Sequence, residues 1–153
     1  MYSIIIQGKK ESGKSTTIGE VCRLLKPTKV SVIRKEPSVT EEVPIDQIYN
    51  ETYILEVKGK NILVMAGAPT EQKVTIAEMI EICNEMNISI DFIICAMRTK
   101  ERKPSSPTVH EIKKMSTLLQ IFKIQRIDGD DYRESIEWKD RIADILKTIN
   151  DNL

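Results

Sequence analysis

Short apolar runs alternate along the chain with segments whose apolar residues recur at helical spacing. The runs that predict strands lie at residues 2–7, 29–33, 52–57, 62–66, 90–97 and 121–127. Helices are predicted over residues 15–26 and after capping signals at Thr75, Thr108 and Asp131. This alternation predicts an α/β fold, a three-layer α/β/α sandwich around a mainly parallel five-stranded sheet. Residues 52–57 are expected to add an antiparallel hairpin strand, and residues 34–50 to form a loop.

The loop between the first predicted strand and the first predicted helix has a spacing that indicates a ligand. Gly8–Ser15 reads GKKESGKS, which fits the pattern G-x-x-x-x-G-K-[ST] of phosphate-binding loops. Glycines let backbone N–H groups turn inward towards an anion, and the helix presents its positive end to the same phosphates. Lys14 is expected to reach the β- and γ-phosphates, and Ser15 to ligate Mg²⁺. The expected nucleotide-binding residues are Gly8, Lys9, Lys10, Glu11, Ser12, Gly13, Lys14, Ser15 and Thr16.

Through this motif the chain resembles the P-loop NTPase superfamily, and Gly8–Thr16 is similar to the loop G-K-G-G-x-G-K-S-T of ParA/MinD-type ATPases. Lys9 falls at the position of that family's signature lysine, which contacts phosphate across a dimer interface. Lys10 and Glu11 stand where that family has two glycines. The resemblance implies a nucleotide switch that forms a homodimer or acts through a protein partner.

A second local likeness involves Arg34–Pro37, which looks like the Arg-Glu-Pro that follows the second strand of thymidylate kinases. The later Asp-Arg-Tyr motif of those kinases is absent. In the ParA/MinD comparison, Glu36 falls at the second acid of an Asp-x-Asp-Pro segment, and Arg34 replaces the first.

The strand at residues 62–66 departs most from the superfamily pattern. P-loop NTPases usually end this strand with an aspartate that holds Mg²⁺, whereas here it runs into Gly67 and no acid follows before Glu71. The departure implies weaker metal binding, an acid supplied from elsewhere, or no hydrolysis. Glu36 is the candidate substitute for metal and catalysis, because the second and third parallel strands are expected to end side by side; a solvated loop glutamate is the alternative.

A basic run, Arg98–Lys103, follows the apolar strand at residues 90–97. Phosphoryl transfer requires positive charge near the transferred group, and arginine often supplies it. Arg98 lies nearest the strand end and is therefore a candidate catalytic residue with Lys14 and Glu36. The run could close over the nucleotide as a lid, or it could be a solvated turn.

Composition narrows the class of protein and its partners. The 153 residues, with 23 basic and 23 acidic side chains, predict a single domain over residues 1–153 and give no direct indication of nucleic acid. No apolar run reaches the length of a membrane span, and no signal peptide is apparent. The three cysteines have no metal-type spacing, which favours a reduced, cytoplasmic protein.

Three functions remain open at this point. The first is an ATP-binding, Mg²⁺-dependent P-loop NTPase, with ATP preferred because the guanine signature Asn-Lys-x-Asp is absent. The second is a small-molecule or nucleoside monophosphate kinase. The third is a degenerate module that binds nucleotide without hydrolysing it.

Overall fold

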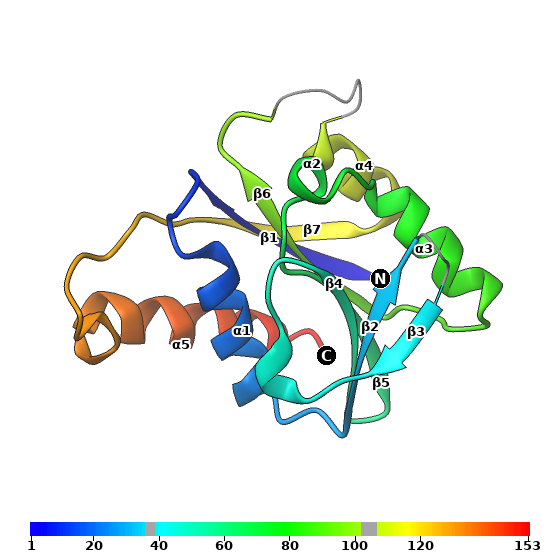
Figure 1. The fold of residues 1–153 in the computed structure, drawn as a ribbon, viewed down its shortest axis with the longest axis horizontal. Coiled ribbons are helices and arrows are strands. Elements are labelled where there is room, and N and C mark those ends of the chain that lie inside the picture. The colour runs from blue at the N-terminus through cyan, green and yellow to red at the C-terminus, as the bar shows by residue number, and fades with distance from the viewer. Residues whose placement is uncertain (36–38, 102–106) are drawn as a thin grey trace.

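The computed structural model describes residues 1–35, 39–101 and 107–153, with one sheet flanked by helices (Figure 1). The strands are β1 (Tyr2–Gly8), β2 (Lys29–Arg34), β3 (Val39–Glu42), β4 (Thr52–Val57), β5 (Lys60–Met65), β6 (Phe92–Arg98) and β7 (Thr117–Lys123). The helices are α1 (Lys14–Leu24), α2 (Pro69–Gln72), α3 (Ile76–Glu85), α4 (Thr108–Met115) and α5 (Ile136–Asn150), with 3-10 turns η1 (Ile45–Gln47) and η2 (Tyr132–Glu134).

The sheet is mixed, so the prediction of a mainly parallel five-stranded sheet is wrong. Its seven strands lie in the order β3-β2-β4-β5-β6-β1-β7. The pairs β1–β6, β1–β7 and β5–β6 are parallel, whereas β2–β3, β2–β4 and β4–β5 are antiparallel. Lys58 and Gly59, both at positive φ, turn β4 directly back into β5, and the other edge of β4 pairs with β2. β3 forms within the segment that was expected to be a loop.

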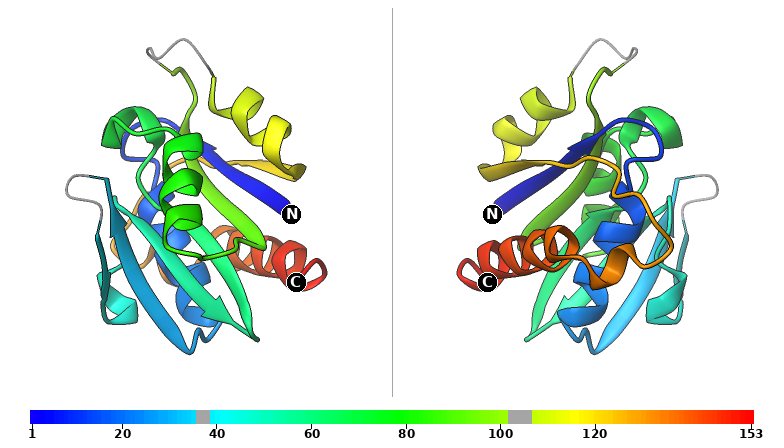
Figure 2. Two further views of the ribbon diagram at one scale, coloured as in Figure 1. Left: turned by 90° about the vertical axis from the view of Figure 1, so that its right-hand side faces the viewer. Right: turned by 90° about the vertical axis from the view of Figure 1, so that its left-hand side faces the viewer.

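The helices cover both faces of this sheet (Figure 2). One apolar core joins the inner sides of α1 and α5 to one face, and a second core joins α3 and α4 to the other. β1 contributes to both cores, because Ile4 and Ile6 belong to the first and Ile5 to the second. All three side chains are fully buried, as is typical of a strand that is covered on both faces.

Capping residues fix some helix boundaries as expected and shift others. The capping box between Thr75 and Glu78 is present at the start of α3. The Thr108 hydroxyl instead donates to Glu101, and α5 is capped by Ser135 rather than by Asp131. β7 begins before the predicted strand at residues 121–127, because the backbone N–H of Thr117 already donates to the Met1 carbonyl beside the start of β1.

Within the described ranges, no helix has the length and apolar character that crossing a membrane requires.

Candidate functional site

The phosphate-binding motif forms a tight loop between the end of β1 and the start of α1. Gly8 ends β1, in register with Arg98 at the end of β6. A Cβ atom on Gly8 would lie 2.2 Å from the Ser12 Oγ atom and 2.9 Å from the Ser12 Cβ atom, so a side chain at this position would force Ser12 to shift. Gly13 precedes α1 at a φ of 91°, which also favours glycine. Glycine is therefore favoured at these two positions of the motif for different structural reasons.

Lys14 lies folded across the inside of this loop. Its Nζ atom donates to the carbonyl oxygens of Gly8 at 3.0 Å and Lys9 at 2.9 Å, and its side chain is 7% exposed. Burial lowers the pKa of the Lys14 ammonium, and the nearby Glu71 carboxylate partly offsets this effect. The lysine of the sequence motif is thus a buried cation at the point where α1 begins.

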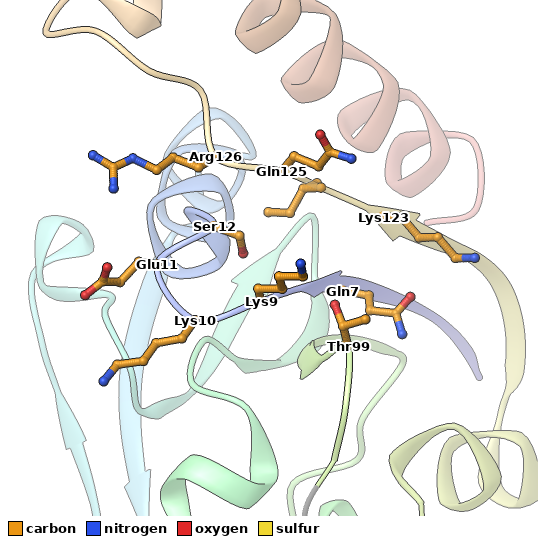
Figure 3. A pocket seen from close by; sticks show the side chains of 10 residues that line it. Gln7, Lys9, Lys10, Glu11, Ser12, Thr99, Lys123, Gln125 and Arg126 are labelled. Atoms are coloured by element: carbon orange, nitrogen blue, oxygen red, sulfur yellow. The ribbon is translucent and has the colours of Figure 1, made fainter.

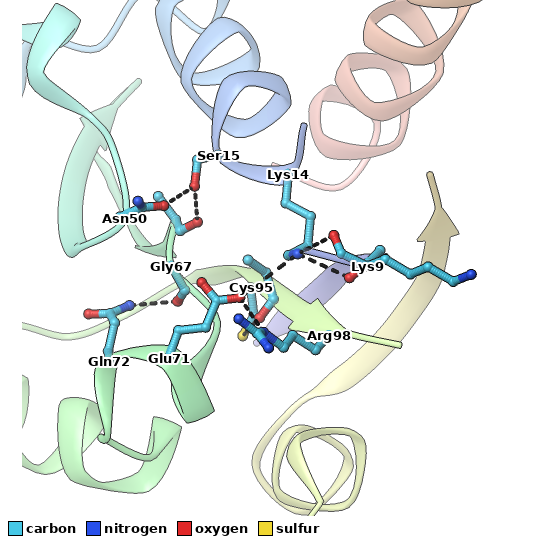
Figure 4. Close-up of polar contacts among 12 residues, drawn as sticks. Lys9, Lys14, Ser15, Asn50, Gly67, Glu71, Gln72, Cys95 and Arg98 are labelled. Carbon is cyan, nitrogen blue, oxygen red and sulfur yellow. Dashed lines mark hydrogen bonds and ion pairs between the residues drawn. The ribbon is translucent and has the colours of Figure 1, made fainter. Parts of the chain in front are cut away.

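The Ser15 hydroxyl faces two acceptor oxygens from distant parts of the chain. Its Oγ atom lies 2.5 Å from Asn50 Oδ1 and 2.9 Å from the carbonyl oxygen of Ala66, beyond the end of β5 (Figure 4). One hydroxyl proton can serve only one of these acceptors. Three oxygen atoms therefore converge here, a set of the kind that hard divalent cations prefer.

Asn50 is held in this place by the chain that follows β5. A Cβ atom on Gly67 would lie 2.3 Å from the Asn50 carbonyl oxygen, so glycine is required for the two backbones to approach. Asn50 itself has a φ of 49°, a left-handed conformation that asparagine tolerates better than most residues. Gln72 donates to the Gly67 carbonyl at 2.6 Å and accepts from Thr52 at 3.0 Å, which ties α2 to β4.

Glu71, from α2, supplies a carboxylate to the same region. Its Oε1 atom accepts a hydrogen bond from Arg98 Nε at 2.8 Å and lies 3.9 Å from Lys14 Nζ. The first acid that follows β5 in the sequence therefore lies beside both Lys14 and Arg98. Arg98 is brought to Lys14 as expected, because β6 lies beside β1.

These residues surround a pocket of about 390 Å³ at the start of α1. Tyr49 and Asn50 line this pocket, although the sequence did not indicate them. Glu71 also lines it, and the sequence indicated it only as the first acid after the strand at residues 62–66. The predicted residues that line it are Lys10, Glu11, Gly13, Lys14, Ser15, Thr16 and Arg98.

The remaining predicted site residues lie elsewhere. The Lys9 side chain extends away from Lys14 (Figure 4), and Ser12 faces the opposite side of the loop. Glu36 is outside the described residues. The reason for choosing it is wrong, however, because β4 separates β2 from β5, so that the ends of those two strands are not adjacent.

Comparisons with protein-family models, curated proteins and solved structures found no match. Among the described residues there is no group of three or more histidine, cysteine or acidic side chains that could hold a metal ion.

Proposed function

We propose that this chain is an ATP-binding, Mg²⁺-dependent P-loop NTPase whose phosphate site is the pocket at the start of α1. The observation that carries the proposal is the closed loop from Gly8 to Gly13 with the Lys14 ammonium buried inside it. Such a loop offers backbone N–H groups, a helix N-terminus and a cation to one anion.

Phosphate binding would exchange the contacts that Lys14 makes now. Its two carbonyl partners belong to the loop, and its carboxylate neighbour Glu71 lies at 3.9 Å. A triphosphate would offer Lys14 and Arg98 a stronger anionic partner than Glu71, leaving the carboxylate to orient water or a hydrated metal ion. Lys14 and Arg98 would then flank the transferred group with positive charge, which is the main requirement of phosphoryl transfer.

The oxygen atoms around Ser15 suit the proposed metal site. The Ser15 hydroxyl, the Asn50 amide oxygen and the Ala66 carbonyl converge on one point, and Glu71 lines the same pocket. Mg²⁺ typically takes one or two protein ligands, phosphate oxygens and waters. When bound there, it would neutralise charge on the phosphates and polarise them.

Replacing Asn50 by aspartate should raise the affinity of the ATP complex for Mg²⁺ by about tenfold, because a carboxylate replaces an amide oxygen beside Ser15. Aspartate also tolerates the left-handed backbone at this position. Calorimetric titration of Mg²⁺ into the ATP-bound protein measures the change. The matched control is Asn87→Asp, also at a left-handed position but after α3, where Mg²⁺ affinity should stay unchanged. Equal Mg²⁺ affinity of the Asn50→Asp and wild-type proteins would count against this metal site.

A non-hydrolysing nucleotide-binding module is the second candidate function. It is favoured by one observation: the two acceptors that face Ser15 are an amide and a backbone carbonyl rather than carboxylates. Phosphate release and sedimentation in Mg²⁺ and ATP distinguish the candidates. An NTPase of the ParA/MinD type should release phosphate and dimerise with ATP. Tight ATP binding by a monomer that releases no phosphate would favour the module.

A further inference from the structure

A second, larger pocket lies on the other side of the phosphate-binding loop. Its volume is about 700 Å³, compared with about 390 Å³ for the pocket that contains Lys14 and Ser15. Lys9 and Ser12, which do not line the first pocket, line this one, while Lys10 and Glu11 lie in the wall between the two. Its other walls are the ends of β1 and β7 and the residue after β6, Thr99 (Figure 3).

Basic residues from three segments line this pocket. Lys9 and Lys10 come from the loop, Lys123 from the end of β7 and Arg126 from the segment that follows it, whereas Glu11 is the only acidic residue among the described residues of the lining. The chain as a whole has a net charge of zero, so the excess is local. Arg126 pairs with Asp128 at 3.3 Å, but both side chains are largely exposed, and such pairs are weak. The pocket is therefore suited to an anion.

The Ser12 hydroxyl gives this pocket a buried polar group without a partner. Ser12 is 5% exposed, lines the pocket, and its Oγ atom finds no hydrogen-bond partner among the described residues. A buried hydroxyl that is left unpaired is destabilising. A ligand oxygen in this cationic pocket would supply that partner once the Ser12 side chain turns from Gly8 towards the pocket.

The rest of the described lining is polar and contains no aromatic ring. Gln7, Gln125 and Thr99 add amide and hydroxyl groups, and Ile124 is the single apolar member among the residues that the structure describes. Single-stranded nucleic acids depend on aromatic stacking, and lipids depend on apolar walls. Among the described residues, the lining has neither an aromatic ring nor an extended apolar wall. A small polar ligand is therefore the class that fits this lining. The volume of the pocket falls within the range of about 300–1,000 Å³ that is typical of small-molecule sites.

We propose that this pocket binds a small phosphorylated molecule that carries hydroxyl groups, such as a phosphate monoester of a sugar. Lys9 and Lys123 pair with its phosphate, and Ser12, Gln7 and Gln125 hydrogen-bond to its other oxygens. This is a second ligand site, separate from the nucleotide proposed at Lys14, and it does not depend on that proposal.

The test is an NMR titration of ¹⁵N-labelled protein, free of nucleotide and Mg²⁺, with glucose 6-phosphate as the probe. Saturable shifts are expected for the backbone amides of Thr99, Lys123 and Gln125. The double variant Lys9→Ala/Lys123→Ala should weaken binding by about tenfold or more, because it removes two charge-assisted contacts. The variant keeps the Lys9 carbonyl that Lys14 and Ser12 use.

The matched control is Lys113→Ala/Lys114→Ala on α4, which removes the same charge from exposed positions outside the pocket and should leave the affinity unchanged. Uncharged glucose should give no saturable shifts. The proposal is overturned if glucose 6-phosphate gives no saturable shifts at these amides, if the shifts are confined to Lys14 and Ser15, or if both double variants behave alike. Tighter binding of an oligouridine than of the phosphate ester at these amides would also overturn it, in favour of nucleic acid.

Discussion

Replacing Lys14 by alanine should weaken ATP binding by about a hundredfold or more. The Lys14 ammonium is already buried inside the loop, where phosphate would take the place of its carbonyl partners. Each hydrogen bond to a charged group contributes about 1.5–3 kcal/mol, so the loss of contacts to two phosphates accounts for at least this factor. Isothermal titration calorimetry measures the change directly.

The control for this prediction is Lys113→Ala, which removes a lysine from an exposed position of α4. Its ATP affinity should equal that of the wild type. Thermal unfolding of each variant shows whether the fold is retained, because Lys14→Ala also removes the hydrogen bonds that Lys14 donates to the Gly8 and Lys9 carbonyls. An unchanged ATP affinity in a folded Lys14→Ala protein would contradict the proposed phosphate site.

Gly67→Ala should destabilise the protein by about 2–4 kcal/mol and separate Asn50 from Ser15. The added Cβ atom would lie 2.3 Å from the Asn50 carbonyl oxygen, and this neighbour is backbone, which cannot move aside as a flexible side chain can. Chemical denaturation gives the free energy of unfolding. The affinity for Mg²⁺ in the ATP complex should also fall, because Asn50 contributes one of the three converging oxygens.

Gly19→Ala within α1 is the matched control for this substitution. Its Cβ atom would lie 3.4 Å from the Ile48 carbonyl oxygen, close to an ordinary contact, and alanine favours helix more than glycine does. The stability should change by less than about 1 kcal/mol. Similar stabilities of the Gly67→Ala and wild-type proteins would show that the close approach of Gly67 to Asn50 is not required.

The sequence predicts those parts of the molecule in which local pattern and tertiary structure agree. The run at Ile4–Ile6 is apolar at every position, and it forms a strand buried on both faces. The Thr75 capping signal is confirmed because both of its hydrogen bonds are local. The glycines of the loop are explained by the closeness of Gly8 to Ser12 and by the positive φ of Gly13.

The order of the strands could not be predicted in the same way. Apolar periodicity identifies β4 as a strand, but the strand gives no local indication of whether it pairs at an edge or within the sheet. Its position between β2 and β5 overturned the reason for assigning the metal to Glu36. It also placed the residues before β4, including Asn50, beside the end of β5.

The contributions of Asn50 and Glu71 depend on contacts between distant segments. Ser15 and Asn50 are 35 residues apart, and Arg98 and Glu71 are 27 residues apart. One sequence signal was available for each. Gly67 after a buried strand indicates a close backbone approach, and Glu71 is the first acid after that strand. Neither signal identifies the partner, which only the three-dimensional arrangement supplies.

The most direct test of the nucleotide site is a crystal structure of the protein with Mg²⁺ and a non-hydrolysable ATP analogue. We expect the β- and γ-phosphates within the loop Gly8–Ser15, the Lys14 ammonium on phosphate instead of on the Gly8 and Lys9 carbonyls, and Mg²⁺ beside the Ser15 hydroxyl. An analogue bound at another place, or a loop in which Lys14 keeps its carbonyl partners while the analogue is present at saturating concentration, would contradict the proposed function.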